Sequence, residues 1–368
     1  MRPYLYSLAS DKKKGFIAGV IKILLSLLAF IYASAVRSLI FIYSIRPYRL
    51  KCKVISVGNI TLGGTGKTSL VELIARYLKE NGHRIAILSR GYKRRVDSRQ
   101  STVDRKTVDS GLWTMEYRMM GDEPYMLKKS LTDIPVLVDS NRIRSANLGI
   151  RDYDVDTVIL DDGLQQWKIK KDLEIVVIDA SNPFGNRRLL PRGILRQPIS
   201  TLNKADMFIL TKTDLDADVK GIKDFLKRIN HPAEIFESVH KPVGFYRVGE
   251  SEKLLDTDMF KGKTVAIFSG IGDPLYFENT VKKLGLQICL SFRFADHYHY
   301  SEGDLNNIIA ESAQQNAAAI LTTEKDAARL DTQLLRNNLP AIFVLRIELE
   351  IIEDAEKFYH RLRQLYSL

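Results

Sequence analysis

The stretch from Val54 to Leu70, VISVGNITLGGTGKTSL, decides the fold. An apolar run typical of a buried strand leads into a glycine-rich turn, which ends in Gly66, Lys67 and Thr68 before a helical pattern begins. Glycines let backbone N–H groups converge on phosphate oxygens, and the N-terminus of the following helix attracts the same negative charge. The stretch therefore predicts a phosphate-binding loop.

The side chains of this loop have separate expected roles. Lys67 is expected to reach the β- and γ-phosphates of a nucleotide, and the hydroxyl of Thr68 to bind Mg²⁺. The strict pattern has glycine where this chain has Thr61, and the two glycines that follow partly compensate. A glycine-rich loop without a nucleotide is the alternative, but the flanking strand and helix favour the nucleotide. We expect nucleotide contacts from Thr61, Gly63, Gly64, Thr65, Gly66, Lys67, Thr68 and Ser69.

Past this loop the pattern alternates between helix and strand. Apolar residues at helical spacing from Ser69 to Lys79 are followed by a strand at 84–88. Continuous apolar runs predict further buried strands at 135–138, 157–160, 174–178 and 207–210. Such runs, separated by helical lengths, indicate an α/β fold of the P-loop NTPase type, with a mostly parallel sheet and helices on both faces. Ligands of such sheets bind at the carboxyl ends of the strands.

The length of 368 residues predicts more than one domain, because single cores rarely exceed about 250–300 residues. We expect an N-terminal membrane-associated helical segment at 1–50, the phosphate-loop domain at 51–240 and a smaller α/β domain at 241–368. A composition change from His240 to Gly244 indicates the linker between the last two. The smaller domain is expected to have strands at 263–268, 287–292, 318–322 and 341–345, and helices at 276–284 and 353–365.

The positive charge of the chain is concentrated near its N-terminus. Residues 1–53 carry ten of the 55 basic residues and one acid, which leaves a net charge of about +2 of the total +11 for the rest of the chain. This distribution disfavours nucleic acid as a partner. Together with apolar runs at 16–36 and 39–45, it favours an anionic membrane surface. Two distant cysteines, Cys52 and Cys289, indicate neither a disulfide framework nor a zinc site, which suits a reducing cytoplasm.

The apolar segment from Phe16 to Val36 would be about 31 Å long as a helix, which just matches a bilayer core. Lys22 lies inside it and basic residues flank both ends, so its orientation is not indicated. A helix that lies in the membrane plane or is partly inserted is slightly favoured. A secretory signal cleaved near Ala33 to Ala35 and an ordinary buried core helix are the alternatives.

Polar residues follow two of the expected strands. Asp161 and Asp162 come directly after the strand at 157–160, in the form of a Walker B element whose terminal carboxylate holds Mg²⁺. Two solvated turn residues are the alternative. Arg90 follows the strand at 84–88 and is a candidate phosphate ligand, with a surface arginine as the alternative.

Two further clusters carry titratable side chains. The run Gly121 to Pro124 places Asp122 and Glu123 at an expected helix start, where capping and compensation of the helix dipole are the simpler interpretation. The run FADHYHY at 294–300 contains His297 after an expected strand. An Asp-His-x-His group at the end of a strand can bind phosphate, a metal or a carboxylate partner, although a lone histidine is more often structural.

The motifs together resemble the tetraacyldisaccharide 4′-kinase family, the lipid A kinases of Gram-negative bacteria. The resemblance implies an ATP-dependent, Mg²⁺-assisted phosphotransferase. Its substrate would be an anionic glycolipid, tetraacyldisaccharide 1-phosphate, which is phosphorylated on the 4′-hydroxyl to lipid IVA in lipopolysaccharide biosynthesis. It also implies that the protein is located at the cytoplasmic face of the inner membrane, bound either peripherally or through a single N-terminal helix. No obligate protein partner is evident. The matching runs cover nearly the whole chain and are GNITLGGTGKTS, SRGY, GDEP, DDGLQ, FGNRRLLPRGILRQP, FADHYHY and TTEKDAARL.

The resemblance assigns roles to individual residues. Asp122 corresponds to the general base, His297 to its partner and Lys67 to the third catalytic residue. Because Asp122 and His297 are expected in different domains, they would have to meet across a cleft whose closure expels water. Thr68, Asp161 and Asp162 would bind Mg²⁺. The remaining matches, near the substrate or the phosphates, are Arg90, Tyr92, Glu123, Arg142 and Gln165.

Two departures from the family pattern alter the expected chemistry. Gln166 replaces a common histidine, and a carboxamide cannot carry a proton. In the loop that contains Leu190 to Pro198, Gln197 replaces a glutamate and Arg192 adds positive charge. A more basic loop suits a phosphorylated lipid, and a solvated basic loop is the alternative.

Two functions of other classes remain as rivals. Thr211 to Asp214, TKTD, resembles the guanine-binding element of GTPases, so a membrane-associated GTPase switch is the main rival. Against it, Leu164 stands where a D-x-x-G switch needs glycine. A non-enzymatic protein of the membrane surface is the other rival, and it would leave Lys67 and the carboxylate pair without a role.

Overall fold

The computed structural model describes residues 11, 13–91, 120–215, 217–250, 253–330 and 342–367. These residues form two compact units. Unit 1 comprises the described parts of 1–90, 133–239 and 349–368, and unit 2 those of 91–132 and 240–348. The grouping differs from the expected ranges at 91–132 and at 349–368. Asp122 and His297 therefore belong to the same unit, and the expectation that they come from different domains is wrong.

Unit 1 is built on a parallel sheet with the strand order β3-β2-β4-β1-β5-β6-β7. β1 lies between β4 and β5 and is parallel to both. The predicted strands are confirmed as β2 to β6, with ends that differ by at most one residue. The strands are β1 (Lys53–Gly58), β2 (Ile85–Ser89), β3 (Val136–Val138), β4 (Thr157–Asp161), β5 (Leu173–Asp179), β6 (Met207–Thr211) and β7 (Glu234–Arg247).

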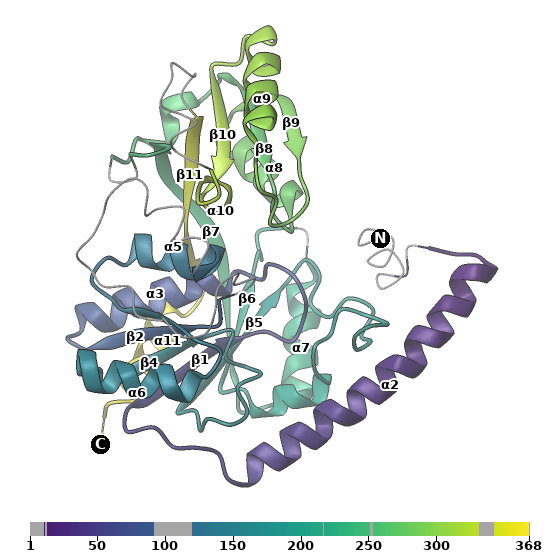
Figure 1. Cartoon of the computed structure of the whole chain (residues 1–368), viewed down its shortest axis with the longest axis vertical. Coiled ribbons are helices and arrows are strands. Elements are labelled where there is room, and N and C mark those ends of the chain that lie inside the picture. Colours follow the sequence, from purple (N-terminus) through teal and green to yellow (C-terminus); the bar gives the residue numbers. More distant parts are fainter. Residues whose placement is uncertain are drawn as a thin grey trace. The chain divides into compact units, whose positions relative to one another are not determined.

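Among the described residues, four helices of unit 1 connect these strands, one precedes β1 and one lies near the C-terminus (Figure 1). They are α2 (Phe16–Ile45), α3 (Lys67–Glu80), α6 (Arg142–Tyr153), α7 (Val219–Ile229), α11 (Ala355–Arg363) and the 3₁₀-helix η1 (Ile199–Lys204). In one part of the core, Ala146 of α6 packs with Ala86 and Leu88 of β2. In another, Leu226 of α7 packs with Phe208 of β6. Strands buried on this scale explain the continuous apolar runs of the sequence.

Unit 2 has a second set of parallel strands in the order β11-β10-β8-β9. Its predicted strands are confirmed, although β11 is longer than predicted. The boundary predicted at His240 to Gly244 agrees with the start of unit 2 at His240, although these residues lie within β7 rather than in a loop. The elements are β8 (Thr264–Ser269), β9 (Gln287–Arg293), β10 (Ala319–Thr323), β11 (Ile342–Ile351), α5 (Asp122–Ser130), η2 (Thr257–Phe260), α8 (Pro274–Lys283), α9 (Glu302–Gln314) and α10 (Glu324–Ala327).

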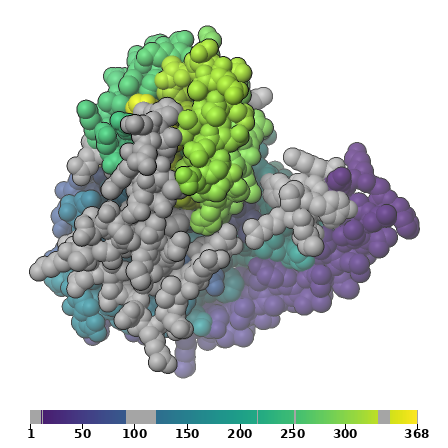
Figure 2. All heavy atoms as spheres, turned by 45° about the horizontal axis from the view of Figure 1, so that its top comes forward, coloured from purple at the N-terminus to yellow at the C-terminus, as the bar shows by residue number. Residues whose placement is uncertain are grey.

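The N-terminal apolar segment forms one helix, α2, of 30 residues. It is the helix, among the described residues, that is long and apolar enough to cross a membrane. Only four of its residues are buried, Ala18, Ala29, Ala33 and Val36. The alternative of an ordinary core helix does not fit this exposure. In Figure 2 the side chains of α2, in purple, form a long exposed surface.

The end of β1 gives a test of how tightly the phosphate loop is supported. A Cβ atom at Gly58 would lie 2.4 Å from the Cβ and 2.5 Å from the backbone nitrogen of Leu164. Because backbone must move, we expect Gly58→Ala to lower the free energy of unfolding by about 1–3 kcal/mol. Gly64→Ala is the control, since a Cβ there meets nothing within 4 Å. Urea denaturation of both variants checks this, and equal stability would contradict it.

Candidate functional site

The parallel sheet of unit 1 brings the phosphate loop and the Asp161–Asp162 pair to one edge. Val57 of β1 is in register with Asp161 of β4, so the chain segments that follow both strands leave the sheet side by side. In the loop, Gly63 and Gly66 have φ angles of +115° and +83°, which favour glycine. Nothing lies within 4 Å of a Cβ built at Gly63 or Gly64. The loop therefore has open space beside its backbone, as a phosphate cradle requires.

A small charge cluster occupies this edge of the sheet. The Nζ of Lys67 donates a hydrogen bond of 3.1 Å to Oδ1 of Asn59 and lies 3.7 Å from Oδ1 of Asp162. The guanidinium of Arg196 donates to both carboxylate oxygens of Asp162, at 2.8 Å each. Arg196 also donates to the carbonyl oxygen of Asn59. Two cations therefore converge on one carboxylate at the place where phosphates are expected.

These contacts determine the ionisation of Asp162. Burial alone would raise the pKa of its carboxyl, but the hydrogen bonds from Arg196 and the charge of Lys67 lower the pKa to about 2. Asp162 is therefore ionised at neutral pH. A carboxylate in this state can bind a divalent cation once its present partner yields.

Asp161 and Arg142 are buried next to this cluster. Asp161 is 2% exposed, and one carboxylate oxygen accepts a hydrogen bond of 3.1 Å from Ser89. Arg142, also 2% exposed, begins α6 and donates to the backbone carbonyl of Asp139. Burial lowers the pKa of Arg142 to about 10, against the opposing effect of Asp161. Arg142 thus remains a buried cation next to the carboxylate pair.

The residues that could hold Mg²⁺ are few. Among the residues that the structure describes, no group of three or more His, Cys, Asp or Glu side chains could hold a metal ion. Such a small donor set fits Mg²⁺, which is commonly bound through one or two carboxylates together with substrate phosphates. Asp161, Asp162 and the half-buried Thr68 are the available protein donors.

The basic loop after β5 packs directly on the phosphate loop. Thr61 forms an antiparallel bridge with Leu195, and the backbone N–H of Arg196 donates to the carbonyl of Ile60 at 2.6 Å. Thr61 is buried and accepts hydrogen bonds from the amide of Asn59. These contacts explain why a threonine is tolerated where the strict motif has glycine. They also place Arg196 beside the phosphate loop, whereas the sequence alone indicated only that it belongs to a basic loop.

Other predicted residues of unit 1 lie nearby or outside the described residues. The side-chain amide of Gln165 donates to the carbonyl of Asn59 at 3.0 Å. Arg90 follows β2 and is exposed, and Tyr92 lies outside the described residues. In the GTPase-like element, the hydroxyl of Thr211 donates to the carbonyl of Thr65 at 3.0 Å. Thr211 therefore supports the phosphate loop from within the sheet.

Unit 2 contains the predicted pair of Asp122 and His297. Asp122 begins α5 after Gly121, whose φ is +86°. The Nδ1 of His297 lies 2.7 Å from Oδ2 of Asp122, so the predicted contact is present. The backbone of His297 has a φ of +62°, and its N–H donates to the carbonyl of Gly270 at 3.1 Å. A carboxylate held by an imidazole in this way can accept a proton from a hydroxyl group.

Three residues of the last motif complete this cluster, and sequence reasoning gave them no role. Both Nε and Nη2 of Arg329 lie 2.7 Å from Oδ2 of Asp122. Asp326 binds the other side of the same guanidinium, at 3.1 Å. The Nζ of Lys325 donates to Glu123 at 3.2 Å. The motif TTEKDAARL was the only sequence feature that marked these three residues, and no local pattern in it indicates a contact with α5.

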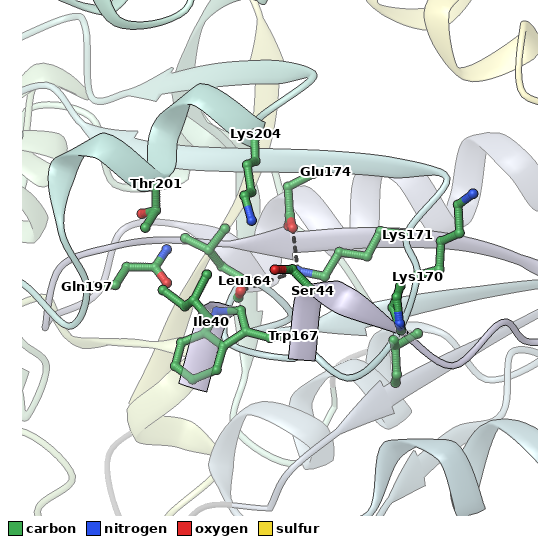
Figure 3. A pocket seen from close by; sticks show the side chains of 12 residues that line it. Ile40, Ser44, Leu164, Trp167, Lys170, Lys171, Glu174, Gln197, Thr201 and Lys204 are labelled. Carbon is green, nitrogen blue, oxygen red and sulfur yellow. Dashed lines mark hydrogen bonds and ion pairs between the residues drawn. The ribbon is translucent and has the colours of Figure 1, made fainter. Parts of the chain in front are cut away.

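A separate pocket of about 180 Å³ lies in unit 1 (Figure 3). Ile40 and Ser44 of α2 line it together with Leu164 and Trp167. The carboxyl of Glu174 forms an ion pair with Lys171 at one wall. Gln197 is 1% exposed, and within the described part of the chain its carboxamide has no hydrogen-bond partner. The glutamate-to-glutamine departure of the sequence thus lies in this pocket.

Comparisons with known proteins agree on one family. A family model described as tetraacyldisaccharide-1-P 4′-kinase matches residues 21–367. The tetraacyldisaccharide 4′-kinase of Halothermothrix orenii is 31% identical over 367 residues, which cover 95% of this chain and 94% of that protein. The enzyme of the same name from Elusimicrobium minutum is 36% identical over 314 residues, or 83% of this chain and 80% of that protein.

A solved structure extends the similarity to the fold. The crystal structure of the "apo" form of LpxK from Aquifex aeolicus in complex with ATP matches with a TM-score of 0.71 and 26% sequence identity. The match covers 94% of this chain and all of that one. The similarity therefore includes both units and not only the phosphate-loop part.

Proposed function

The chain belongs to the tetraacyldisaccharide-1-P 4′-kinase family, and we propose that it transfers the γ-phosphate of ATP to the 4′-hydroxyl of a tetraacyldisaccharide 1-phosphate. This phosphotransferase reaction belongs to lipid A biosynthesis. The observation that carries the proposal is the contact of Asp122 with His297, in a chain that also has a phosphate loop. A hydroxyl acceptor needs a proton acceptor, whereas a GTPase switch or a binding protein has no use for this pair.

Unit 1 supplies the nucleotide-binding groups in this proposal. The backbone N–H groups of the glycine-rich loop and the Nζ of Lys67 bind the phosphates of ATP. Thr68, Asp161 and Asp162 would hold Mg²⁺, and its chemistry when bound is to neutralise phosphate charge. Arg196 now pairs with Asp162, and its guanidinium can turn to a phosphate oxygen when that carboxylate is taken up by a cation.

Unit 2 supplies the proton acceptor. The 4′-oxygen forms a bond to the γ-phosphorus while the bond from that phosphorus to the β–γ bridging oxygen breaks, and ADP leaves with the electron pair. The carboxylate of Asp122 takes the hydroxyl proton and later passes it to solvent. His297 holds the carboxylate during this step. That a closing movement of the two domains excludes water stays a prediction.

The remaining predicted contacts are proposals of different kinds. Arg90 is exposed after β2 and suits a phosphate group that arrives from solvent. Arg142 is buried, so its charge acts through the neighbouring carboxylates. Glu123, next to the proposed base, is paired with Lys325. Gln165 holds the backbone of Asn59 beside Lys67. Tyr92 remains a candidate from the family resemblance alone.

α2 is the proposed membrane contact, at the cytoplasmic face of the inner membrane. Large apolar side chains along its length are exposed, including Phe16 at 88% and Ile23 at 71%. Basic residues precede the helix and follow it. Exposed apolar surface next to cationic side chains binds anionic membranes, whether the helix lies in the interface or inserts. The glycolipid substrate also resides in a membrane, which places enzyme and substrate together.

Membrane binding can be tested with three substitutions on α2. Leu24, Leu28 and Ile31 are each more than half exposed. We expect L24E/L28E/I31E to weaken binding to anionic vesicles by at least about tenfold, because apolar burial in the membrane is lost. ATP affinity should not change. Ile352→Glu, an exposed apolar residue elsewhere in unit 1, is the control. Co-sedimentation measures this, and unchanged binding of the triple variant would count against α2.

The nucleotide reaction is tested by labelled phosphate transfer in detergent. With tetraacyldisaccharide 1-phosphate as acceptor, the wild-type chain should transfer the γ-phosphate of ATP, and Lys67→Ala should lower the rate about a hundredfold or more. GTP should be a poor donor. Nucleotide hydrolysis without phosphorylated lipid, especially from GTP, would instead favour the GTPase switch.

The role of Asp122 has its own test. Asp122→Asn removes the proton acceptor but keeps the size of the side chain, so kcat should fall about 10²- to 10⁴-fold. The affinity for ATP, measured by calorimetry, should stay within about twofold because the nucleotide groups are on other residues. Turnover close to that of the wild type would dismiss Asp122 as the base.

A further inference from the structure

The motif TTEKDAARL at 322–330 is the one family run to which sequence reasoning assigned no chemistry. It forms the end of β10, the short helix α10 and the residues just after it. We propose that Arg329 is a positioning residue of the kinase reaction, which holds the carboxylate of Asp122 in one orientation and in its ionised form. The inference rests on the proposed role of Asp122 as the base.

The motif first builds a rigid support for Arg329. The hydroxyl of Thr323 and the carboxylate of Asp326 form a cap at the start of α10, at 2.6 Å. The Oδ1 of Asp326 accepts hydrogen bonds from the backbone N–H of Gly270 at 2.9 Å and from the hydroxyl of Tyr300 at 2.8 Å. The side chain of Asp326 is fully buried. It is therefore fixed by donors from three separate parts of unit 2.

Arg329 then connects this support to Asp122. Its side chain has no exposed surface. One edge of the guanidinium contacts Asp122, while Nη1 donates to Asp326 at 3.1 Å and to the carbonyl of Gly270 at 2.7 Å. A fully buried cation is stable only when its charge and its donors are matched. Two carboxylates and a carbonyl meet that requirement here.

Two donor groups thus determine the position of one carboxylate oxygen. In the tautomer that carries a proton on Nδ1, His297 donates to Oδ2 of Asp122, and Arg329 donates to the same atom from its own side. Hydrogen bonds from two rigid groups restrict the rotation of the carboxylate. A general base must be both correctly aimed and deprotonated before the hydroxyl arrives. Arg329 meets both requirements. Its hydrogen bonds orient the carboxylate, and its charge favours the deprotonated form because a guanidinium keeps its proton at any assay pH.

Other charged groups around Asp122 do not replace this cation. Lys325 pairs with Glu123, and Asp296 lies 3.7 Å from the other ring nitrogen of His297. Burial raises the pKa of Asp326 despite its hydrogen bonds, and the charge of the Arg329 guanidinium opposes this rise. The titratable or charged side chains near Asp122 are Glu123, Asp296, His297, Lys325, Asp326 and Arg329.

The test compares Arg329→Gln and Arg329→Lys in the full-length chain. Gln keeps hydrogen bonding without charge, and Lys keeps charge without the planar fork. The matched control is Arg293→Gln, because Arg293 forms a two-point ion pair with Glu278 in the same unit. For each variant, kcat and KM for both substrates are measured as a function of pH, and thermal unfolding is recorded alongside.

We expect Arg329→Gln to lower kcat about tenfold to a hundredfold through misplacement of the base. Without the neighbouring cation, Asp122 takes up a proton more readily, so the acid limb of the kcat profile should move up by about one pH unit. KM for ATP should not change. Arg329→Lys should recover most of kcat and return the acid limb towards the wild type. Arg293→Gln should leave the profile unchanged.

Several results would overturn the inference. If Arg329→Gln keeps wild-type kcat, or loses it without movement of the acid limb and without recovery in Arg329→Lys, then Arg329 only stabilises the fold. If Arg329→Gln does not fold, Arg329→Lys alone decides. An acid limb of Arg329→Lys that moves up by about one pH unit, although the charge is kept, would then refute the charge argument. Asp122→Asn is measured in parallel. Full activity of that variant would remove the proposed base itself, whereas its inactivity confines any failure to Arg329.

Discussion

The parallel pairing of β1 with β4 is the constraint on which the nucleotide site depends. It brings the segments after Gly58 and after Asp161 to the same edge of the sheet. The glycine-rich loop and the carboxylate pair are about a hundred residues apart in the chain, and this register makes them neighbours. Leu164 closes over Gly58, and Thr211 of β6 supports Thr65 from beneath. The site thus depends on three parallel strands of one sheet, β4, β1 and β6, rather than on one loop.

In both units an arginine holds a carboxylate of the proposed site, with different degrees of burial. In unit 1 the side chain of Arg196 is 19% exposed and meets Asp162, which a cation can take over. In unit 2 the side chain of Arg329 is fully buried between Asp122 and Asp326. The first arrangement can rearrange when a ligand binds, and the second is fixed by its surroundings. This difference suits the exchangeable metal site proposed in unit 1 and the fixed base proposed in unit 2.

Much of the fold follows from patterns that are local in the sequence. Buried parallel strands read as apolar runs, so β2 to β6 were predicted to within one residue at each end. The boundary at His240 to Gly244 was predicted in the right place, but the chain passes from one unit to the other within the partly exposed strand β7 rather than through a loop. The apolar runs of the N-terminus continue through Arg37 as one helix, since a single exposed charge does not end a helix.

The candidate site was only partly predictable. The phosphate loop and the Asp161–Asp162 pair follow from motif chemistry, whereas the Asp122–His297 pair came from family resemblance, because two residues 175 positions apart leave no local signal. Arg329 and Arg196 were missed for the same reason. The placement of Asp122 in unit 2 depends on tertiary contacts of α5 that no propensity encodes. Tyr92 lies outside the described residues, so its role stays a prediction.

The most direct test of the central claim is the position of the new phosphate on the lipid. The purified chain is incubated with ATP, Mg²⁺ and tetraacyldisaccharide 1-phosphate, and the product is analysed by mass spectrometry and phosphorus NMR. The account predicts one added phosphate per ADP released, attached at the 4′-oxygen while the 1-phosphate is retained. ADP release without a phosphorylated lipid, or a phosphate at another position, would contradict it.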